Sequence, residues 1–131
     1  MENNDMSNIR VFTIIGEAES SQQIEQHLHG ESSYTLMGQV KIGFEGIERC
    51  KVISPDVVIV DRGVGDVDSL EVVRQLKDIN SAIAYVMISF TLELDWMREA
   101  VLLGVDNFVP KPIDKATLIH AINHAYNSLK T

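Results

Sequence analysis

Short runs of consecutive apolar residues alternate along this chain with longer segments whose apolar residues recur every three or four positions. The short runs are rich in β-branched residues and predict buried strands, whereas the spacing in the longer segments predicts amphipathic helices. The predicted strands cover residues 11–15, 34–40, 57–60, 83–88 and 107–109. The predicted helices cover the segment between Ser20 or Ser21 and Gly30, residues 44–53, 69–78 and 95–103, and the segment after Asp114. The predicted N-terminal caps of the first, fourth and last of these helices are Ser20 or Ser21, Asp95 and Asp114.

Five strand–helix units therefore follow one another along the chain. A predicted helix joins each strand to the next, as a crossover between parallel strands requires. The order therefore predicts an α/β fold in which helices cover both faces of a parallel five-stranded sheet. The run 57–60 is apolar at every position, which is typical of a central parallel strand. Because no repeat or linker interrupts this order, we expect residues 1–131 to form one domain with a core over about residues 9–129.

Composition and charge exclude several classes of function. With 131 residues and 45% hydrophobic residues, the chain is long and apolar enough to bury a core. The net charge of −8 argues against direct binding of nucleic acid. The longest apolar run, residues 82–88, is far shorter than the ~20 residues of a membrane span. The polar start has no secretory pattern, and Cys50 is the single cysteine, so we expect a soluble cytoplasmic protein without a membrane partner.

Reactive polar residues stand at the ends of three predicted strands. Asp61 follows the third strand, Ser89 follows the fourth, and Lys111 comes shortly after the fifth. The carboxyl ends of parallel strands share one edge of a sheet, where ligands bind. Each of these residue types is common in an ordinary structural role. Together at one edge, a carboxylate, a hydroxyl and an ammonium predict a site for a phosphoryl group, with a nucleophile, a donor and a counter-charge.

The order of these residues resembles the response-regulator receiver domain, the CheY-like domain of two-component signalling. The resemblance covers residues 10–129 and is carried by Asp61, by Leu70 and Glu71 in the next helix, by Ser89, and by the segments 104–108 and 109–112. It implies a flavodoxin-type fold, a three-layer sandwich whose parallel strands are in the order 2-1-3-4-5. It also implies a phosphoprotein that catalyses only its own phosphorylation and is not otherwise an enzyme.

The resemblance implies a role for each of these residues. Asp61 would be the phosphoacceptor, attacking a phosphohistidine on a sensor histidine kinase or a phosphotransfer protein, in line with known aspartyl-phosphate chemistry. Lys111 would place a positive charge beside the phosphoryl oxygens. Ser89 would donate a hydrogen bond to the phosphorylated form, and Phe108 would be the switch aromatic that responds to it. A cis peptide bond is expected between Lys111 and Pro112.

The acidic metal site departs from the pattern of the family. The first strand is followed there by two adjacent acids, whereas this chain has Gly16 and Glu17. The resemblance then implies that Glu17, Asp61 and the backbone carbonyl of Gly63 are the ligands of Mg²⁺, an ion that prefers oxygen ligands. Because this chain has one acid fewer than the family pattern and glutamate is longer than aspartate, we expect Mg²⁺ to bind weakly. The alternative is that Glu17 is a surface acid in a degenerate site.

A second departure lies beside the predicted site. The position after Ser89, normally small in the family, is Phe90, whose ring would restrict access of a donor or of water to Asp61. Gly65 replaces the usual proline of the following loop. We therefore expect a phosphoryl group on Asp61 to be long-lived.

Other polar and aromatic residues have plainer interpretations. His120 and His124 are four residues apart on the last helix, but without a third ligand they are predicted to face solvent. Asp66 and Asp68 are predicted to be solvated loop acids. Trp96 begins a helix whose outer face is expected to be partly exposed. The resemblance implies that the fourth helix, fifth strand and fifth helix form an interaction surface that often mediates a homodimer.

Two other functions are alternatives to a phosphorylated switch. The first is a pseudo-receiver, a domain of the same fold that binds partners without phosphorylation, possibly as the amino-terminal part of a larger regulator. Gly16 and Phe90 favour this alternative, whereas the presence of Asp61, Ser89 and Lys111 argues against it. The second is a flavodoxin-like cofactor binder, which requires a phosphate-binding loop after the first strand. The segment 16–19 is too acidic for that role.

Overall fold

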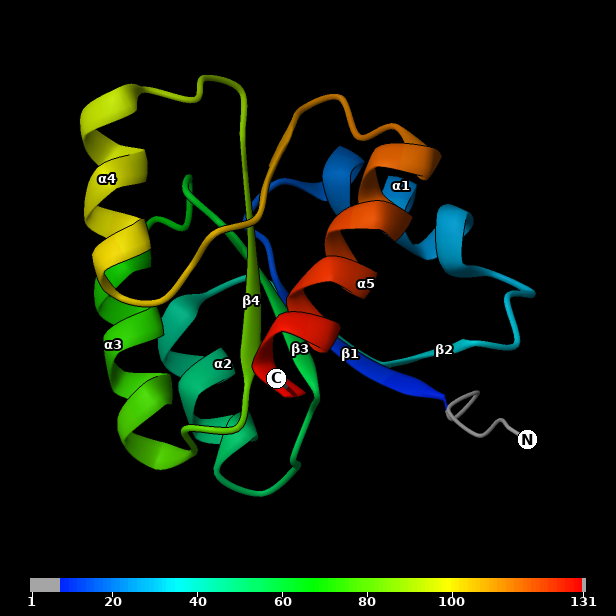
Figure 1. Cartoon of the computed structure of the whole chain (residues 1–131), viewed down its shortest axis with the longest axis horizontal. Helices are drawn as coiled ribbons and strands as arrows, with labels where there is room; N and C mark the ends of the chain where they lie inside the picture. Colours follow the sequence, from blue (N-terminus) through cyan, green and yellow to red (C-terminus); the bar gives the residue numbers. More distant parts are fainter. Residues whose placement is uncertain (1–7, 131) are drawn as a thin grey trace.

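The computed structural model describes residues 8–130, and residues 1–7 of the polar start lie outside the described residues. Five strands and five helices alternate along the chain (Figure 1). They are β1 (Ile9–Ile14), α1 (Ala18–Leu28), β2 (Tyr34–Val40), α2 (Gly43–Cys50), β3 (Val57–Asp61), α3 (Ser69–Ile79), β4 (Ala84–Ser89), α4 (Leu94–Leu102), β5 (Phe108–Pro110) and α5 (Lys115–Lys130).

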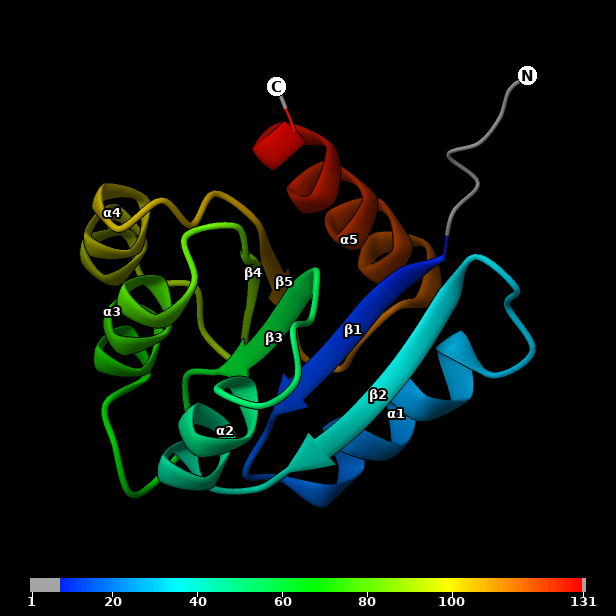
Figure 2. The same cartoon turned by 90° about the horizontal axis from the view of Figure 1, so that it is seen from below.

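The sheet is parallel throughout, and its strands are in the order β2-β1-β3-β4-β5. Helices α1 and α5 cover one face, and α2, α3 and α4 cover the other, as the two perpendicular views show (Figures 1 and 2). This arrangement confirms the predicted three-layer α/β fold and strand order. All five strands therefore end at the same edge of the sheet, where loops lead into the following helices.

The core lies on both faces of the sheet, and β3 shows why its sequence is apolar throughout. Val58 and Val60 pack in the cluster under α2, α3 and α4, whereas Val57 and Ile59 pack in the cluster under α1 and α5. All four side chains are fully buried. Since successive side chains on a strand point to opposite faces, a strand covered on both sides has no position left for a polar residue.

Two helices begin earlier than their sequences suggested. Helix α1 starts at Ala18 with Glu17 at the N-cap position, so Ser20 lies inside the first turn and its Oγ donates to Glu17 Oε1 at 2.6 Å. Helix α4 starts at Leu94, which places Asp95 within the first turn as well. The prediction of Ser20 and Asp95 as caps was therefore wrong.

The end of α1 and the start of α5 agree with the predictions from the sequence. Gly30, just beyond α1, has a φ of 78°, a conformation that glycine adopts without strain. The carboxylate of Asp114 accepts a bond from the backbone N–H of Thr117 at 2.9 Å, which is the predicted cap of α5.

Asp66 and Asp68 hold the loop between β3 and α3 in place. The carboxylate of Asp66 accepts bonds from the backbone N–H groups of Gly43, at 2.7 Å, and of Phe44, at 3.0 Å. These bonds lower the pKa of Asp66 below its ordinary value. Asp68 caps α3 by accepting from the backbone N–H of Leu70. Both acids are exposed in the loop, as predicted, and each in addition satisfies free N–H groups at a helix start.

Trp96 is buried, with an exposed fraction of 8%, although the outer face of its helix is partly exposed as predicted. Leu94 and Leu102 on that face are exposed. Over the described range 8–130, no helix has the length and apolar character needed to cross a membrane.

Close packing of α2 against the end of β1 gives a test of the fold. A Cβ on Gly46 would lie 2.4 Å from Cδ1 and 2.6 Å from Cγ1 of Ile14, which is fully buried. Alanine gains about 1 kcal/mol of helix propensity over glycine, but overpacking a dense core costs about 1–3 kcal/mol. We expect Gly46→Ala to lower the free energy of unfolding, measured by chemical denaturation, by about 1 kcal/mol.

Gly65→Ala is the matched control for this substitution, because a Cβ at Gly65 meets no atom within 4 Å. An unchanged or raised stability of Gly46→Ala would contradict the tight contact between α2 and β1.

Candidate functional site

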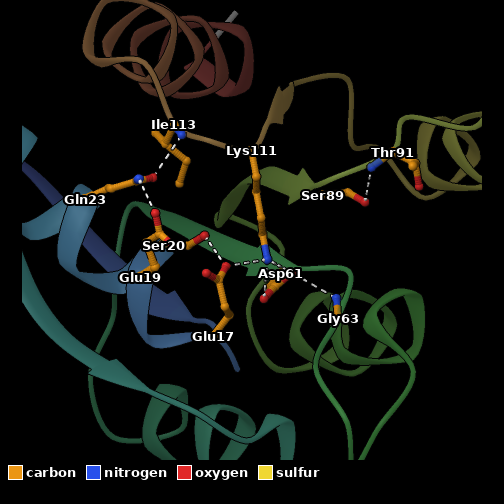
Figure 3. A network of polar contacts seen from close by, with 10 residues as sticks. All are labelled: Glu17, Glu19, Ser20, Gln23, Asp61, Gly63, Ser89, Thr91, Lys111 and Ile113. Carbon is orange, nitrogen blue, oxygen red and sulfur yellow. Dashed lines mark hydrogen bonds and ion pairs between the residues drawn. The ribbon is translucent and has the colours of Figure 1, made fainter.

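Three neighbouring strands place polar side chains at the same edge of the sheet. Asp61 ends β3, Ser89 ends β4, and Lys111 directly follows β5. In the sheet register Asp61 lies beside Ile88, and Ser89 lies beside Pro110. This register brings residues that are up to 50 positions apart in sequence to one place (Figure 3).

Lys111 is the centre of the site. Its Nζ lies 3.0 Å from both carboxylate oxygens of Asp61 and 3.2 Å from Oε1 of Glu17. The side chains of Lys111 and Asp61 are only 4% and 2% exposed. Because desolvating a charge is costly, a buried ammonium needs such partners, and loss of Lys111 would leave the buried carboxylate of Asp61 without its cation.

Asp61 has both of its carboxylate oxygens in hydrogen bonds. Oδ1 accepts from the backbone N–H of Gly63 at 2.9 Å, while both oxygens face Lys111. The peptide bond from Lys111 to Pro112 is cis, as the resemblance implied. The carboxylate is therefore held in a single orientation at the end of a rigid strand.

Glu17 lies on the other side of the Lys111 ammonium. Its pKa is below its ordinary value, first because Ser20 donates a hydrogen bond to it and further because Lys111 is close. The Glu17 side chain is 33% exposed, far more than that of Asp61. The pair of carboxylates thus consists of one buried member and one that is open to solvent.

Ser89 is buried, but its hydroxyl is bonded to the following loop. Its Oγ accepts from the backbone N–H of Thr91 at 3.2 Å. In Figure 3 the hydroxyl points toward Thr91 and away from the Asp61 carboxylate. A bond from Ser89 to a group on Asp61 would therefore require rotation of the serine side chain and loss of the Thr91 bond.

Phe90 lies at the mouth of the site. The Nζ of Lys111 is 4.7 Å from the centroid of its ring, while the side chain remains exposed at 66%. A small hollow beside the ring is lined by Glu17, Ser20 and Lys111, among other residues. The aromatic face stabilises the ammonium by a cation–π interaction and narrows the approach to it.

Phe108 lies outside the charged cluster, at the start of β5. Its half-buried ring is 5.7 Å from that of Trp96, with 66° between the ring planes. This edge-to-face arrangement is the favourable one for two aromatic rings. Phe108 therefore contacts the first turn of α4 rather than Asp61 or Lys111.

The oxygen atoms at this edge match the ligand preference of Mg²⁺. Glu17 and Asp61 supply carboxylates on two sides of the Lys111 ammonium, and Gly63 supplies a carbonyl. A Cβ on Gly16 would lie 3.5 Å from that carbonyl oxygen, so the missing side chain would have been next to it. Within residues 8–130, no three His, Cys, Asp or Glu residues are grouped to hold a metal. An ion here would have two carboxylates and would retain several waters.

Sequence reasoning missed a supporting residue beside the site. Gln23 of α1 accepts a hydrogen bond from the backbone N–H of Ile113 at 2.9 Å, which ties the segment after Lys111 to α1 (Figure 3). No pattern distinguishes this glutamine from its polar neighbours. The histidines of α5 are exposed as predicted, although His124 Nδ1 lies 2.8 Å from Oδ1 of Asn107.

Comparison with known proteins gives the family. Residues 12–123 match the response regulator receiver domain. The chain is 28% identical over 105 residues to the response regulator protein VraR of Staphylococcus saprophyticus, covering 80% of this chain and 50% of VraR. It is 23% identical over 97 residues to the chemotaxis protein CheY of Bacillus subtilis, covering 74% of this chain and 81% of CheY. The chain thus spans half of VraR but most of CheY.

Solved structures with the same fold agree with this match. The receiver domain of a modulated diguanylate cyclase from Desulfovibrio desulfuricans has a TM-score of 0.84 at 18% identity, covering 95% of this chain and 98% of that domain. A CheX–CheY–BeF₃–Mg complex from Borrelia burgdorferi includes a chain with a TM-score of 0.83 at 16% identity, covering 92% of this chain and 90% of that one. With its match over residues 12–123, the chain belongs to the response regulator receiver domains, the phosphoacceptor signalling domains of two-component systems rather than enzymes.

Proposed function

We propose that Asp61 accepts a phosphoryl group from a phosphohistidine on a sensor histidine kinase or a phosphotransfer protein. The observation that carries this proposal is the buried contact of Lys111 Nζ with both oxygens of Asp61 at 3.0 Å. A carboxylate at the end of a central strand is a positioned nucleophile. A neighbouring ammonium compensates the negative charge that a phosphoryl group brings.

The transfer needs few parts of the protein. An oxygen of Asp61 attacks phosphorus while the bond from phosphorus to the histidine nitrogen breaks, which gives an aspartyl phosphate and a free imidazole. Lys111 stays beside the phosphoryl oxygens, and the backbone N–H of Gly63 is a second donor in place. Ser89 supplies a third donor once it rotates away from Thr91.

Glu17, Asp61 and the carbonyl of Gly63 are the proposed ligands of Mg²⁺. When bound, the ion would neutralise charge on the phosphoryl oxygens. Because Gly16 contributes no carboxylate, the site has fewer acids than its family pattern, and we propose that binding is weak. The lowered pKa of Glu17 keeps this ligand ionised throughout the neutral range.

The output surface that we propose is formed by α4, β5 and α5. Leu94, Met97, Leu102 and Phe108 line most of an apolar hollow of about 510 Å³ on this side. Leu102, at 86% exposed, is favourable for contact with an apolar surface. We propose a second copy of the chain as the occupant, with the exposure of Phe108 as the variable that phosphorylation changes.

The proposed setting is a cytoplasmic pathway that uses protein partners. The net charge of −8 is unfavourable for direct binding of nucleic acid or of an acidic membrane surface. Cys50 is a free thiol in the core, and burial raises its pKa to about 11. We further propose that residues 1–131 act as one receiver domain.

The phosphoacceptor is tested by the mass of the intact protein after incubation with acetyl phosphate and Mg²⁺. The wild type is expected to gain one phosphoryl group, and Asp61→Asn to gain none, because an amide cannot act as the nucleophile. Circular dichroism verifies that the variant is folded. A wild type that remains unmodified would favour the phosphorylation-independent pseudo-receiver.

The metal site is tested by titrating Mg²⁺ and following the backbone amide of Gly63 by NMR. Half-saturation of the wild type is expected above the submillimolar range, and Glu17→Gln is expected to weaken the affinity about ten-fold further. Glu19→Gln is the matched control, since this acid lies two residues away and bonds to Gln23 instead of Lys111. Equal affinities of the wild type and Glu17→Gln would remove Glu17 from the ligand set.

Access to the site is tested by the lifetime of the phosphoryl group. Removing the ring that lies over Lys111 admits water, so Phe90→Ala is expected to lose phosphate about ten-fold faster, about 1.4 kcal/mol in activation free energy. Phe44→Ala, which removes a similarly exposed ring (63%) from α2, is expected to leave the rate unchanged. If the phosphoryl group is short-lived in the wild type and is lost no faster in Phe90→Ala, Phe90 does not restrict access of water to Asp61.

A further inference from the structure

Arg62, the residue directly after Asp61, connects the site to α4. Its backbone N–H donates to the carbonyl of Ile88 at 2.9 Å, which continues the ladder between β3 and β4. Its side chain reaches the start of α4 and makes two contacts there. Nη2 lies 2.8 Å from Oε1 of Glu93, and the guanidinium carbon lies 4.7 Å from the ring centroid of Trp96.

The contact with Trp96 is expected to be the stronger of the two. Glu93 is 63% exposed, and water and salt screen an ion pair at such a position. Trp96 is buried, and the side chain of Arg62 is only 31% exposed, so the stacked guanidinium is partly desolvated. A planar guanidinium is suited to pairing with a carboxylate and stacking on an indole at the same time. Arg62 thus contacts both Glu93, the last residue of the loop between β4 and α4, and Trp96 in the first turn of α4.

That loop, residues 90–93, lies between the proposed phosphoacceptor and α4. At one end Phe90 packs over the ammonium of Lys111. At the other end Glu93, at the N-cap position of α4, is paired with Arg62. The carboxylate of Asp61 is 2% exposed, so a bulky phosphoryl group can reach it only if neighbouring groups move, and Phe90 of this loop lies over the ammonium beside it. The loop is therefore tied at both ends while the site is closed.

We propose that Arg62 is a positioning residue that holds the 90–93 loop closed over Asp61 and restrains the first turn of α4. The inference rests on the proposed phosphoacceptor role of Asp61. A phosphoryl group brings a charge of about −1.5 to −2 and three acceptor oxygens. Opening of the loop to receive it works against the contacts of Arg62 with Glu93 and Trp96. The same displacement reaches Phe108, because its ring packs edge-to-face on Trp96.

Beryllofluoride with Mg²⁺ serves as the probe, because its beryllium coordinates a carboxylate oxygen reversibly and the bound group has the tetrahedral shape of a phosphoryl group. Trp96 is the single tryptophan, so its fluorescence reports on the contact with Arg62. A ligand that binds only the open state gains apparent affinity when the closed state is destabilised. Arg62→Gln is therefore expected to bind beryllofluoride about three- to ten-fold more tightly than the wild type. Incorporation of a phosphoryl group from acetyl phosphate is also expected to be faster in Arg62→Gln than in the wild type.

Three further variants separate this role from a general structural effect. Arg62→Lys keeps the charge but lacks the planar group that pairs and stacks at the same time, so its affinity is expected to lie between those of the wild type and Arg62→Gln. Glu93→Gln removes only the exposed ion pair, so a smaller increase is expected, and this variant serves if Arg62→Gln does not fold. Arg10→Gln is the control, because Arg10 pairs with Asp56 at the opposite end of the sheet and is expected to leave the affinity unchanged.

Each outcome of the experiment has a separate meaning. If the wild type binds beryllofluoride and Arg62→Gln binds it equally or more weakly, Arg62 does not restrain the loop, and the inference is wrong although Asp61 remains the acceptor. If the wild type neither binds beryllofluoride nor incorporates a phosphoryl group from acetyl phosphate, the proposed function is wrong, and the inference is overturned with it. Equal increases in Arg62→Gln and Arg10→Gln would show an effect of net charge alone and would also overturn it.

Discussion

The ammonium of Lys111, buried between Asp61 and Glu17, is the interaction on which the functional edge of the sheet depends. Its position requires that β3 and β5 lie on either side of β4 and that the segment after β5 turns back over the sheet. Because a buried cation without partners is strongly unfavourable, the two carboxylates and the lysine constrain one another. A phosphoryl group on Asp61 would alter this balance directly, which gives a physical reason for a response to phosphorylation.

Polar side chains connect the loops around this centre to neighbouring helices. Asp66 joins the loop after β3 to the N-terminus of α2, Asp68 caps α3, and Gln23 joins the segment after β5 to α1. These contacts leave the loop between β4 and α4 as the one with a different form of attachment. It is held by the ring of Phe90 and the pairing of Glu93, both on exposed side chains. The backbone N–H of Thr91 also donates to Ser89 Oγ, and Leu92 packs against the core.

The charged site and the apolar face of α4 are connected through one layer of side chains. Arg62 extends from the end of β3 to Trp96, and Trp96 packs on Phe108 at the start of β5. Leu94 and Met97 continue this apolar layer to the surface beside Phe108. A signalling domain needs such a connection, because a change of charge in a buried site has no effect on a partner unless a surface also changes. In this chain Arg62, adjacent to the proposed acceptor Asp61, would provide it.

The sequence by itself determined the alternation of strands and helices, because apolar runs buried on both faces and helical spacing of apolar residues are local patterns. The reactive residues Asp61, Ser89 and Lys111 also stood out, since each is at the end of a strand. Only the tertiary structure decided which partners their side chains have. Ser89 is bonded to Thr91, Asp66 caps a helix from another unit, and Arg62 stacks on Trp96. Such contacts join residues from separate elements, and their geometry depends on how the loops pack, which no periodicity in the chain records.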